Sequence, residues 1–140
     1  HGGTPLPFEE LLHNSDYIII QAPLTGETRN LFTEAEFKKM KRGAILINTA
    51  RGPIVDNRAL YRALKEGWIS AAGLDDIEEE PAKKKRWQPD NPLFTLQNVI
   101  ITPHCAYYSE ESIENGRRTA SQEVVRVLTG KPPRYPVNTV

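Results

Sequence analysis

The sequence predicts an α/β fold in which parallel strands alternate with helices. Four short apolar runs are rich in β-branched residues and nearly continuous in hydrophobicity, which is typical of strands buried on both faces of a parallel sheet. Segments with helical start and stop signals separate these runs. With 140 residues and 39% hydrophobic content, the chain can bury one core, so we expect one domain or a large piece of one.

The elements follow each other in the order helix, strand, helix, strand, helix, strand, long loop, strand and helix. A short helix is expected over residues 7–13. The expected strands are residues 17–22, 44–49, 71–75 and 99–102. The loop at 78–98 is long for such a unit and contains three prolines, so we interpret it as a functional loop.

The helix between the first two strands begins at a capping box of Thr33 and Glu36, and Gly43 lies just past its end. Asp56 can cap the next helix, which Gly67 ends. The last helix is the longest and runs from Ser109 to about residue 129. Its expected apolar face is Ile113, Ala120, Val124 and Leu128.

Composition narrows the class of protein. Eighteen basic residues balance eighteen acidic ones, which argues against a nucleic-acid binder. Cys105 is the only cysteine, so no intrachain disulfide forms and a reducing compartment is expected. No apolar stretch reaches the roughly 20 residues that cross a bilayer. We therefore expect a cytoplasmic protein without membrane contact. The chain starts with histidine, which suggests a processed or fragmentary chain.

Charged and titratable residues follow the predicted strands where each strand ends. Arg51 lies in the turn Asn48-Thr49-Ala50-Arg51-Gly52, and Asp75 ends the third strand. Glu80 and His104 follow at the ends of later segments. Because the carboxyl ends of parallel strands bind ligands in open α/β sheets, we expect these groups to converge on one edge.

This set of groups suits hydride exchange between a carbonyl acid and a nicotinamide. The guanidinium of Arg51 can hold a carboxylate with two parallel hydrogen bonds and polarise a carbonyl. The imidazole of His104 can give or take a proton near neutral pH. A carboxylate at Glu80 beside that imidazole would favour its protonated form.

Each residue also has a structural interpretation. Arg51 could cap a strand end or neutralise Asp56. His104, which follows a Thr-Pro turn, could be a hydrogen-bonded structural histidine, and Glu80 in its acidic run could be a surface charge.

Two other chemistries receive little support. Cys105 and His104 could form a nucleophilic pair, but adjacent residues on an extended backbone point to opposite sides. Asp75 and Asp76 could share a metal ion, but no third ligand stands at a suitable spacing.

Several motifs, in order and with their spacing intact, resemble the D-isomer-specific 2-hydroxyacid dehydrogenase family. The resemblance runs from about residue 11 to residue 130. The motifs are Gln21-Ala22-Pro23-Leu24-Thr25 with Thr28, Met40-Lys41-Arg42-Gly43-Ala44, Asn48-Thr49-Ala50-Arg51-Gly52 with Val55-Asp56, Gly73-Leu74-Asp75 with Glu80-Pro81, and Thr102-Pro103-His104. The family includes phosphoglycerate, glyoxylate/hydroxypyruvate and D-lactate dehydrogenases and the C-terminal-binding-protein corepressors. The stretch around His104 is closer to the corepressor-like branch.

The resemblance implies that Arg51 binds the substrate carboxylate and carbonyl, that His104 is the acid/base, and that Glu80 tunes His104. Asp75 would accept a hydrogen bond from the nicotinamide carboxamide. The resemblance also implies a set of residues that line the nicotinamide half of the cofactor, some of which share other roles. They are Ala22, Thr28, Thr49, Ala50, Arg51, Asp75, His104, Cys105, Ala106 and Tyr107.

The chain also departs from the family pattern. Asp76 stands where an apolar residue is usual, and a basic run follows Pro81. The Gly-x-Gly-x-x-Gly turn and the acidic residue for ribose do not occur in the sequence. The resemblance therefore implies the C-terminal half of a Rossmann-like, doubly wound parallel sheet with a long C-terminal helix. We expect residues 1–130 to be this partial dinucleotide-binding domain and residues 131–140 to be a tail.

The expected function is that of an NAD(P)-dependent oxidoreductase, with a 2-oxo acid or D-2-hydroxy acid as substrate and NAD or NADP as cofactor. The residues that choose between the two cofactors are absent from the sequence. The isolated chain is expected to be inactive and to expose apolar surface, and the intact protein to be a homodimer. The alternative is a non-enzymatic module of corepressor type that senses dinucleotide or dimerises.

Overall fold

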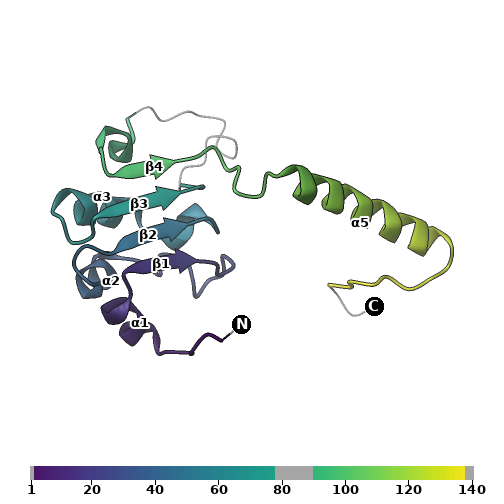
Figure 1. Cartoon of the computed structure of the whole chain (residues 1–140), viewed down its shortest axis with the longest axis horizontal. Helices are drawn as coiled ribbons and strands as arrows, with labels where there is room; N and C mark the ends of the chain where they lie inside the picture. Colours follow the sequence, from purple (N-terminus) through teal and green to yellow (C-terminus); the bar gives the residue numbers. More distant parts are fainter. Residues whose placement is uncertain (1, 78–89, 138–140) are drawn as a thin grey trace. The chain divides into compact units, whose positions relative to one another are not determined.

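A computed structural model describes residues 2–77 and 90–137 (Figure 1). They belong to two compact units, His1–Ala106 and Tyr107–Val140. The elements are α1 (Phe8–Asn14), β1 (Tyr17–Ile20), α2 (Glu34–Lys39), β2 (Ile45–Asn48), the 3-10 helix η1 (Gly52–Ile54), α3 (Asn57–Lys65), β3 (Ala71–Leu74), the 3-10 helix η2 (Pro92–Thr95), β4 (Val99–Ile101) and α5 (Glu110–Leu128).

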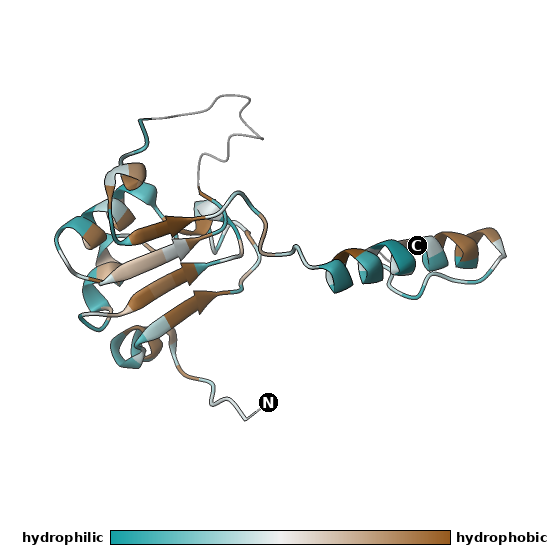
Figure 2. Cartoon of the chain, turned by 45° about the horizontal axis from the view of Figure 1, so that its top comes forward, coloured by the Kyte–Doolittle hydropathy of each residue, from teal (hydrophilic) through white to brown (hydrophobic). Residues whose placement is uncertain are grey.

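Within the described residues of the first unit, the strands form one parallel sheet in the order β1-β2-β3-β4. The predicted α/β fold with a parallel sheet is thus confirmed, and each strand ends one or two residues earlier than expected. The register sets Ile19, Ile47, Gly73 and Ile100 in one row across the sheet. Figure 2 shows β1, β2 and β4 as mostly hydrophobic segments.

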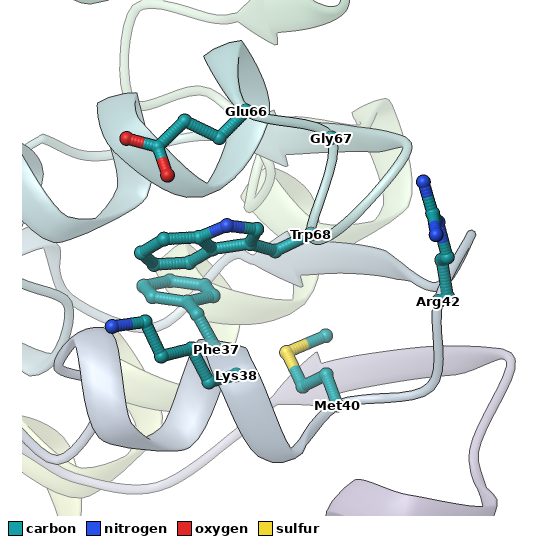
Figure 3. A pocket seen from close by; sticks show the side chains of 7 residues that line it. All are labelled: Phe37, Lys38, Met40, Arg42, Glu66, Gly67 and Trp68. Carbon is teal, nitrogen blue, oxygen red and sulfur yellow. The ribbon is translucent and has the colours of Figure 1, made fainter.

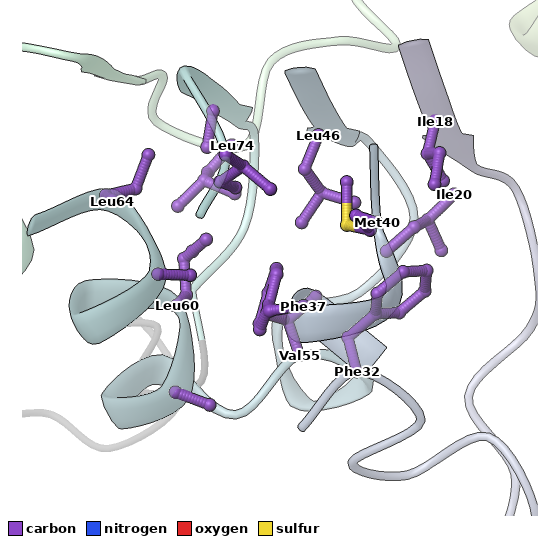
Figure 4. Packing of buried hydrophobic residues seen from close by; sticks show 14 of the residues in the cluster. Ile18, Ile20, Phe32, Phe37, Met40, Leu46, Val55, Leu60, Leu64 and Leu74 are labelled. Atoms are coloured by element: carbon purple, nitrogen blue, oxygen red, sulfur yellow. The ribbon is translucent and has the colours of Figure 1, made fainter. Parts of the chain in front are cut away.

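The core lies on one face of this sheet, where strand side chains meet the helices. Leu46 and Leu74 pack in the same buried cluster as Phe37 of α2 and Leu60 of α3 (Figure 4). On the other face Ile100 is 71% exposed, so the expectation of burial on both faces is wrong for this unit. The strand order explains the difference. Right-handed crossovers between successive neighbours of a parallel sheet all place their helices on the same side.

The predicted helix caps are confirmed. Thr33 accepts the N–H of Ala35, and the Glu36 carboxylate accepts the N–H of Thr33, which completes the capping box. Asp56 Oδ1 accepts the N–H groups of Arg58 and Ala59 at the start of α3. Each bond satisfies a backbone donor that the first turn of a helix leaves unpaired.

Residues 78–89 of the predicted loop 78–98 lie outside the described residues, and the described remainder contains a 3-10 helix, η2, that we did not predict from the sequence. Asn91 caps η2 by accepting the N–H of Leu93 at 3.0 Å, and the Leu93 side chain is completely buried in the core. The pair Asn91-Pro92 indicates the start of this helical turn, since asparagine is favoured just before a helix and proline at its first position.

The second unit is dominated by α5. Ser109 caps it, as predicted, by accepting the N–H of Ser112 at 3.0 Å. None of the residues of α5 is buried, and Leu128 is 81% exposed. Of the apolar face expected on this helix, Ile113 is half-buried, and the described residues of the unit leave Ala120, Val124 and Leu128 exposed. Among the described residues, no helix is long and apolar enough to cross a membrane.

Candidate active site

Three turns that follow β2, β3 and β4 lie next to each other at the carboxyl edge of the sheet. The parallel register pairs Asn48 of β2 with Leu74 of β3, and Leu74 with Ile101 of β4. Arg51, Asp75 and His104 follow these positions by one to three residues. The sheet thus brings together three of the four charged or titratable residues that the sequence singles out.

Asp75 holds the turn that carries His104. Its Oδ1 accepts hydrogen bonds from the Thr102 hydroxyl at 2.5 Å and the Cys105 N–H at 2.8 Å. Its Oδ2 accepts the Ala106 N–H at 2.8 Å. Because the carboxylate is only 4% exposed, these donors replace the water that it would otherwise bind.

The same contacts set the ionisation of Asp75. Burial by itself would raise its pKa, but the hydrogen bonds from Thr102, Ala106 and Cys105 outweigh burial, with a smaller contribution from the positive charge of His104. The net effect lowers the pKa of Asp75 below its ordinary value of 3.8. The carboxylate is therefore ionised at neutral pH.

His104 is half-buried and sits in a left-handed backbone conformation, with φ of 54°. Its N–H donates to the Thr102 carbonyl at 2.9 Å, and its neighbours Cys105 and Ala106 are held by Asp75. This conformation is uncommon for residues other than glycine, and contacts with the surroundings help to hold it. The Asp75 bonds supply that restraint on both residues after His104.

Arg51 is exposed at the end of the turn after β2. One of its guanidinium nitrogens donates to the Ala50 carbonyl at 2.6 Å. A guanidinium has five N–H donors in a planar fork, so this bond leaves donors for a carboxylate. The neighbouring Thr49 accepts a hydrogen bond from Gln21 at 3.0 Å, which ties the ends of β1 and β2 together.

A groove of about 310 Å³ opens beside these turns. Its floor includes Ile47, Gly73 and Ile100 from the exposed face of the sheet. A Cβ at Gly73 would meet no atom within 4 Å, so the space above it is open. The remaining lining residues lie at the strand ends and are Thr49, Leu74, Asp75, Thr102, Cys105 and Ala106.

The other predicted site residues are more scattered. Ala22 is half-buried just after β1, and the Thr28 hydroxyl donates to the Pro23 carbonyl at 2.6 Å in the loop that follows. Tyr107 begins the second unit, where its ring lies 6.3 Å from that of Tyr108. Glu80 lies outside the described residues.

The sequence reading did not assign two residues that this edge uses. Thr102 bonds to Asp75, and Asn48 bonds to the Arg51 turn. Both had a signal. Asn48 is a polar residue at the end of an apolar strand, and Thr102 belongs to the Thr-Pro-His motif.

Asp76 differs sharply from Asp75. It is also only 4% exposed, yet neither of its carboxylate oxygens has a hydrogen-bond partner within residues 2–77 and 90–137. A metal ion does not explain it from the residues in view, because the described parts of the chain contain no group of three or more His, Cys, Asp or Glu residues placed to hold one.

A second hollow, of about 280 Å³, lies near the amino ends of β2 and β3 (Figure 3). The Lys38 ammonium lies 4.7 Å from the centre of the Trp68 ring, and the Arg62 guanidinium carbon lies 5.6 Å from it. Glu34 pairs with both cations. These contacts link α2 to α3, and the charges of Lys38 and Arg62 interact with Glu34 and the Trp68 ring.

Comparison with known proteins gives consistent matches. The family model described as D-isomer specific 2-hydroxyacid dehydrogenase, NAD binding domain, matches residues 1–106. Glyoxylate reductase of Korarchaeum cryptofilum is 43% identical over 133 residues, which are 95% of this chain and 39% of that protein. D-3-phosphoglycerate dehydrogenase of Archaeoglobus fulgidus is 44% identical over 131 residues, 24% of its length.

Among solved structures, D-lactate dehydrogenase with NAD+ from Lactobacillus jensenii superposes with a TM-score of 0.87 at 33% identity. That match covers 96% of this chain and 43% of the other. The chain therefore spans about two fifths of the length of these two relatives, the glyoxylate reductase and the D-lactate dehydrogenase.

Proposed function

Because the chain belongs to the D-isomer-specific 2-hydroxyacid dehydrogenase family, we propose that it supplies the catalytic edge of an NAD(P)-dependent oxidoreductase. The reaction interconverts a small 2-oxo acid and the corresponding D-2-hydroxy acid. The observation that carries the proposal is the adjacency of three restrained turns, which bear Arg51, Asp75 and His104 at one sheet edge.

Arg51 is the substrate clamp in this proposal. Its free N–H donors hold the carboxylate of the 2-oxo acid and polarise the adjacent carbonyl. The turn leaves the guanidinium exposed, so an anion can reach it from solvent. The planar fork also fixes the orientation of the substrate, which a lysine ammonium does not.

His104 is the acid/base. In reduction its imidazolium gives a proton to the carbonyl oxygen, and in oxidation the neutral ring takes that proton back. The restrained backbone of residues 104–106 keeps the imidazole at a fixed place. Glu80 remains the proposed partner that favours the imidazolium.

The donor and acceptor set at the edge fits a nicotinamide cofactor. A carboxylate offers about four lone-pair sites, and Asp75 uses three of them, so one acceptor site is left for a carboxamide N–H. When bound, the cofactor supplies or accepts the hydride. The residues assigned to hold it remain those named above, from Ala22 to Tyr107.

The proposal extends to the whole protein. We assign residues 1–130 to a dinucleotide-binding domain and residues 131–140 to a tail, and we expect a homodimer in the cytoplasm. Size-exclusion chromatography with light scattering, with and without NADH, measures the oligomeric state directly.

The test uses a full-length protein that carries this chain, with NADH or NADPH and glyoxylate, hydroxypyruvate or pyruvate. His104→Asn should lower kcat by about 10²- to 10⁴-fold, the usual contribution of a general acid–base. Arg51→Lys should raise KM for the oxo acid. His13→Asn and Arg42→Lys are matched controls, because both residues are exposed and lie away from the carboxyl edge.

Two outcomes would contradict the proposal. Undiminished turnover in His104→Asn would remove the acid/base assignment. The proposed enzymatic role would also be wrong if the protein oxidised no NADH or NADPH with any of the 2-oxo acids while NADH changed its oligomeric state. That result would favour the dinucleotide-sensing module.

A further inference from the structure

Asn48 is the last residue of β2, and its amide is almost completely buried, with 1% of the residue exposed. The side-chain oxygen accepts the Ala50 N–H at 3.0 Å. The side-chain nitrogen donates to the Arg51 carbonyl at 2.9 Å. One amide group therefore bonds to the main chain of Arg51, the proposed substrate clamp, and of Ala50, the residue before it.

The position of Asn48 is unusual for a polar residue. Along β2 the buried positions are Leu46 and Asn48, so the amide occupies a site that faces the core. A buried amide without partners is strongly unfavourable. Both partners of Asn48 belong to the turn, and so the amide is satisfied only when the turn has this conformation.

Asn48 is also connected to the second restrained turn. Its main-chain carbonyl accepts the Asp75 N–H at 2.9 Å, and the Asp75 carboxylate in turn holds Cys105 and Ala106. Asn48 thus bonds to the Arg51 turn through its side chain. Through its main-chain carbonyl it also bonds to Asp75, which holds the His104 turn.

We propose that Asn48 is a positioning residue for the reaction, which fixes the main chain beneath Arg51 so that the guanidinium stays aligned with the acid/base. This inference rests on the proposed function. A misplacement of about 1 Å in a binding group can cost roughly 10²-fold in rate, so a small shift of the turn is sufficient to be measured.

The experiment compares two variants in the full-length protein. Asn48→Ala removes both bonds and should lower kcat/KM for the 2-oxo acid by roughly 10- to 100-fold, with a lower kcat as well as a higher KM, because the bound substrate is no longer aligned with the acid/base. KM for NADH should stay unchanged. Asn98→Ala is the matched control, since its half-buried amide donates to the Ser70 carbonyl at 3.0 Å near the opposite edge of the sheet.

Asn48→Asp separates positioning from general stability. An ionised carboxylate at this position still accepts the Ala50 N–H but repels the Arg51 carbonyl, whereas the protonated acid can donate to it. Activity of this variant should therefore recover as the pH falls, relative to the unsubstituted protein. A substitution that only weakened the fold would lose activity in parallel with stability and would show no such recovery.

Hydrogen exchange at the Ala50 amide reports the turn independently of turnover. Protection should fall in Asn48→Ala and stay in Asn98→Ala. Lost protection with unchanged kcat/KM would overturn the inference and leave the proposed function intact, and so would equal losses of activity in both variants. An unsubstituted protein that consumes no cofactor with any 2-oxo acid would overturn the proposed function itself.

Discussion

Replacing Asp76 by valine should stabilise the fold of the chain. Asp76 is 4% exposed, and among the described residues its two carboxylate oxygens have no hydrogen-bond partner, whereas the carboxylate of the preceding Asp75 accepts three hydrogen bonds. Leaving a buried polar group unsatisfied costs about 1–3 kcal/mol. Valine removes this penalty and adds apolar surface of similar size, so we expect a gain of about 2 kcal/mol in the free energy of unfolding.

The gain is large enough to measure. Unfolding entropy near 60 °C is about 2 cal/mol/K per residue, which gives roughly 0.3 kcal/mol/K for 140 residues and a rise in Tm of about 7 °C. Urea titration followed by circular dichroism gives the free energy, and calorimetry gives Tm. Asp90→Val is the control, because Asp90 is exposed and its replacement should change stability by less than about 0.5 kcal/mol.

The opposite sign would refute this reasoning. If Asp76→Val lowers the urea midpoint, the carboxylate meets a donor or a cation in solution, and its burial is then compensated. Asp76→Asn adds a second point, because it removes the charge while it keeps the unsatisfied polar atoms. Its stability should lie between those of the aspartate and the valine.

Three further predictions concern hydrogen bonds at defined positions. Because the folded state lowers the pKa of Asp75, its carboxylate stabilises the fold above about pH 4, and this contribution is lost as the pH falls further. Asp75→Asn should therefore make the free energy of unfolding, measured by urea titration at several pH values, depend less on pH below about 4. Thr102→Val should lower kcat/KM by about 10-fold, since it removes the hydrogen bond from the Thr102 hydroxyl to the Asp75 carboxylate that holds the His104 turn. Thr102→Ser keeps the hydroxyl and should restore kcat/KM, and equal kcat/KM values for Thr102→Val and the unsubstituted protein in steady-state assays would contradict this role. Thr33→Ala removes the cap of α2 and should cost about 1 kcal/mol in urea unfolding, and a change near zero would show that the capping box contributes nothing.

Much of the sheet and of the helix boundaries follows from local chemistry and was predictable. The capping residues Thr33, Asp56 and Ser109 act through bonds to residues two or three positions away, so the sequence contains the whole interaction. The order of the strands was not predicted; once it is known, right-handed crossovers explain why the helices cover one face of the sheet.

The restraints at the site were less predictable, because they join segments far apart in the chain. Thr102 meets Asp75 across 27 positions, and only the register of β3 and β4 brings them together. The burial of Asp76 without a hydrogen-bond partner in the described part of the chain also depends on tertiary packing. The sequence identified the type of residue at each strand end, whereas the pairing between strand ends required the three-dimensional structure.

The restraints at the carboxyl edge hold main-chain atoms. Asn48 bonds to the N–H of Ala50 and the carbonyl of Arg51, and Asp75 bonds to the N–H groups of Cys105 and Ala106. Every amino acid except proline offers the same N–H group. Side chains at 50, 105 and 106 can therefore be exchanged while both turns keep their shape. This edge is suited to evolve or to be engineered toward new substrates, because the surface that meets the ligand can change independently of the framework that holds it.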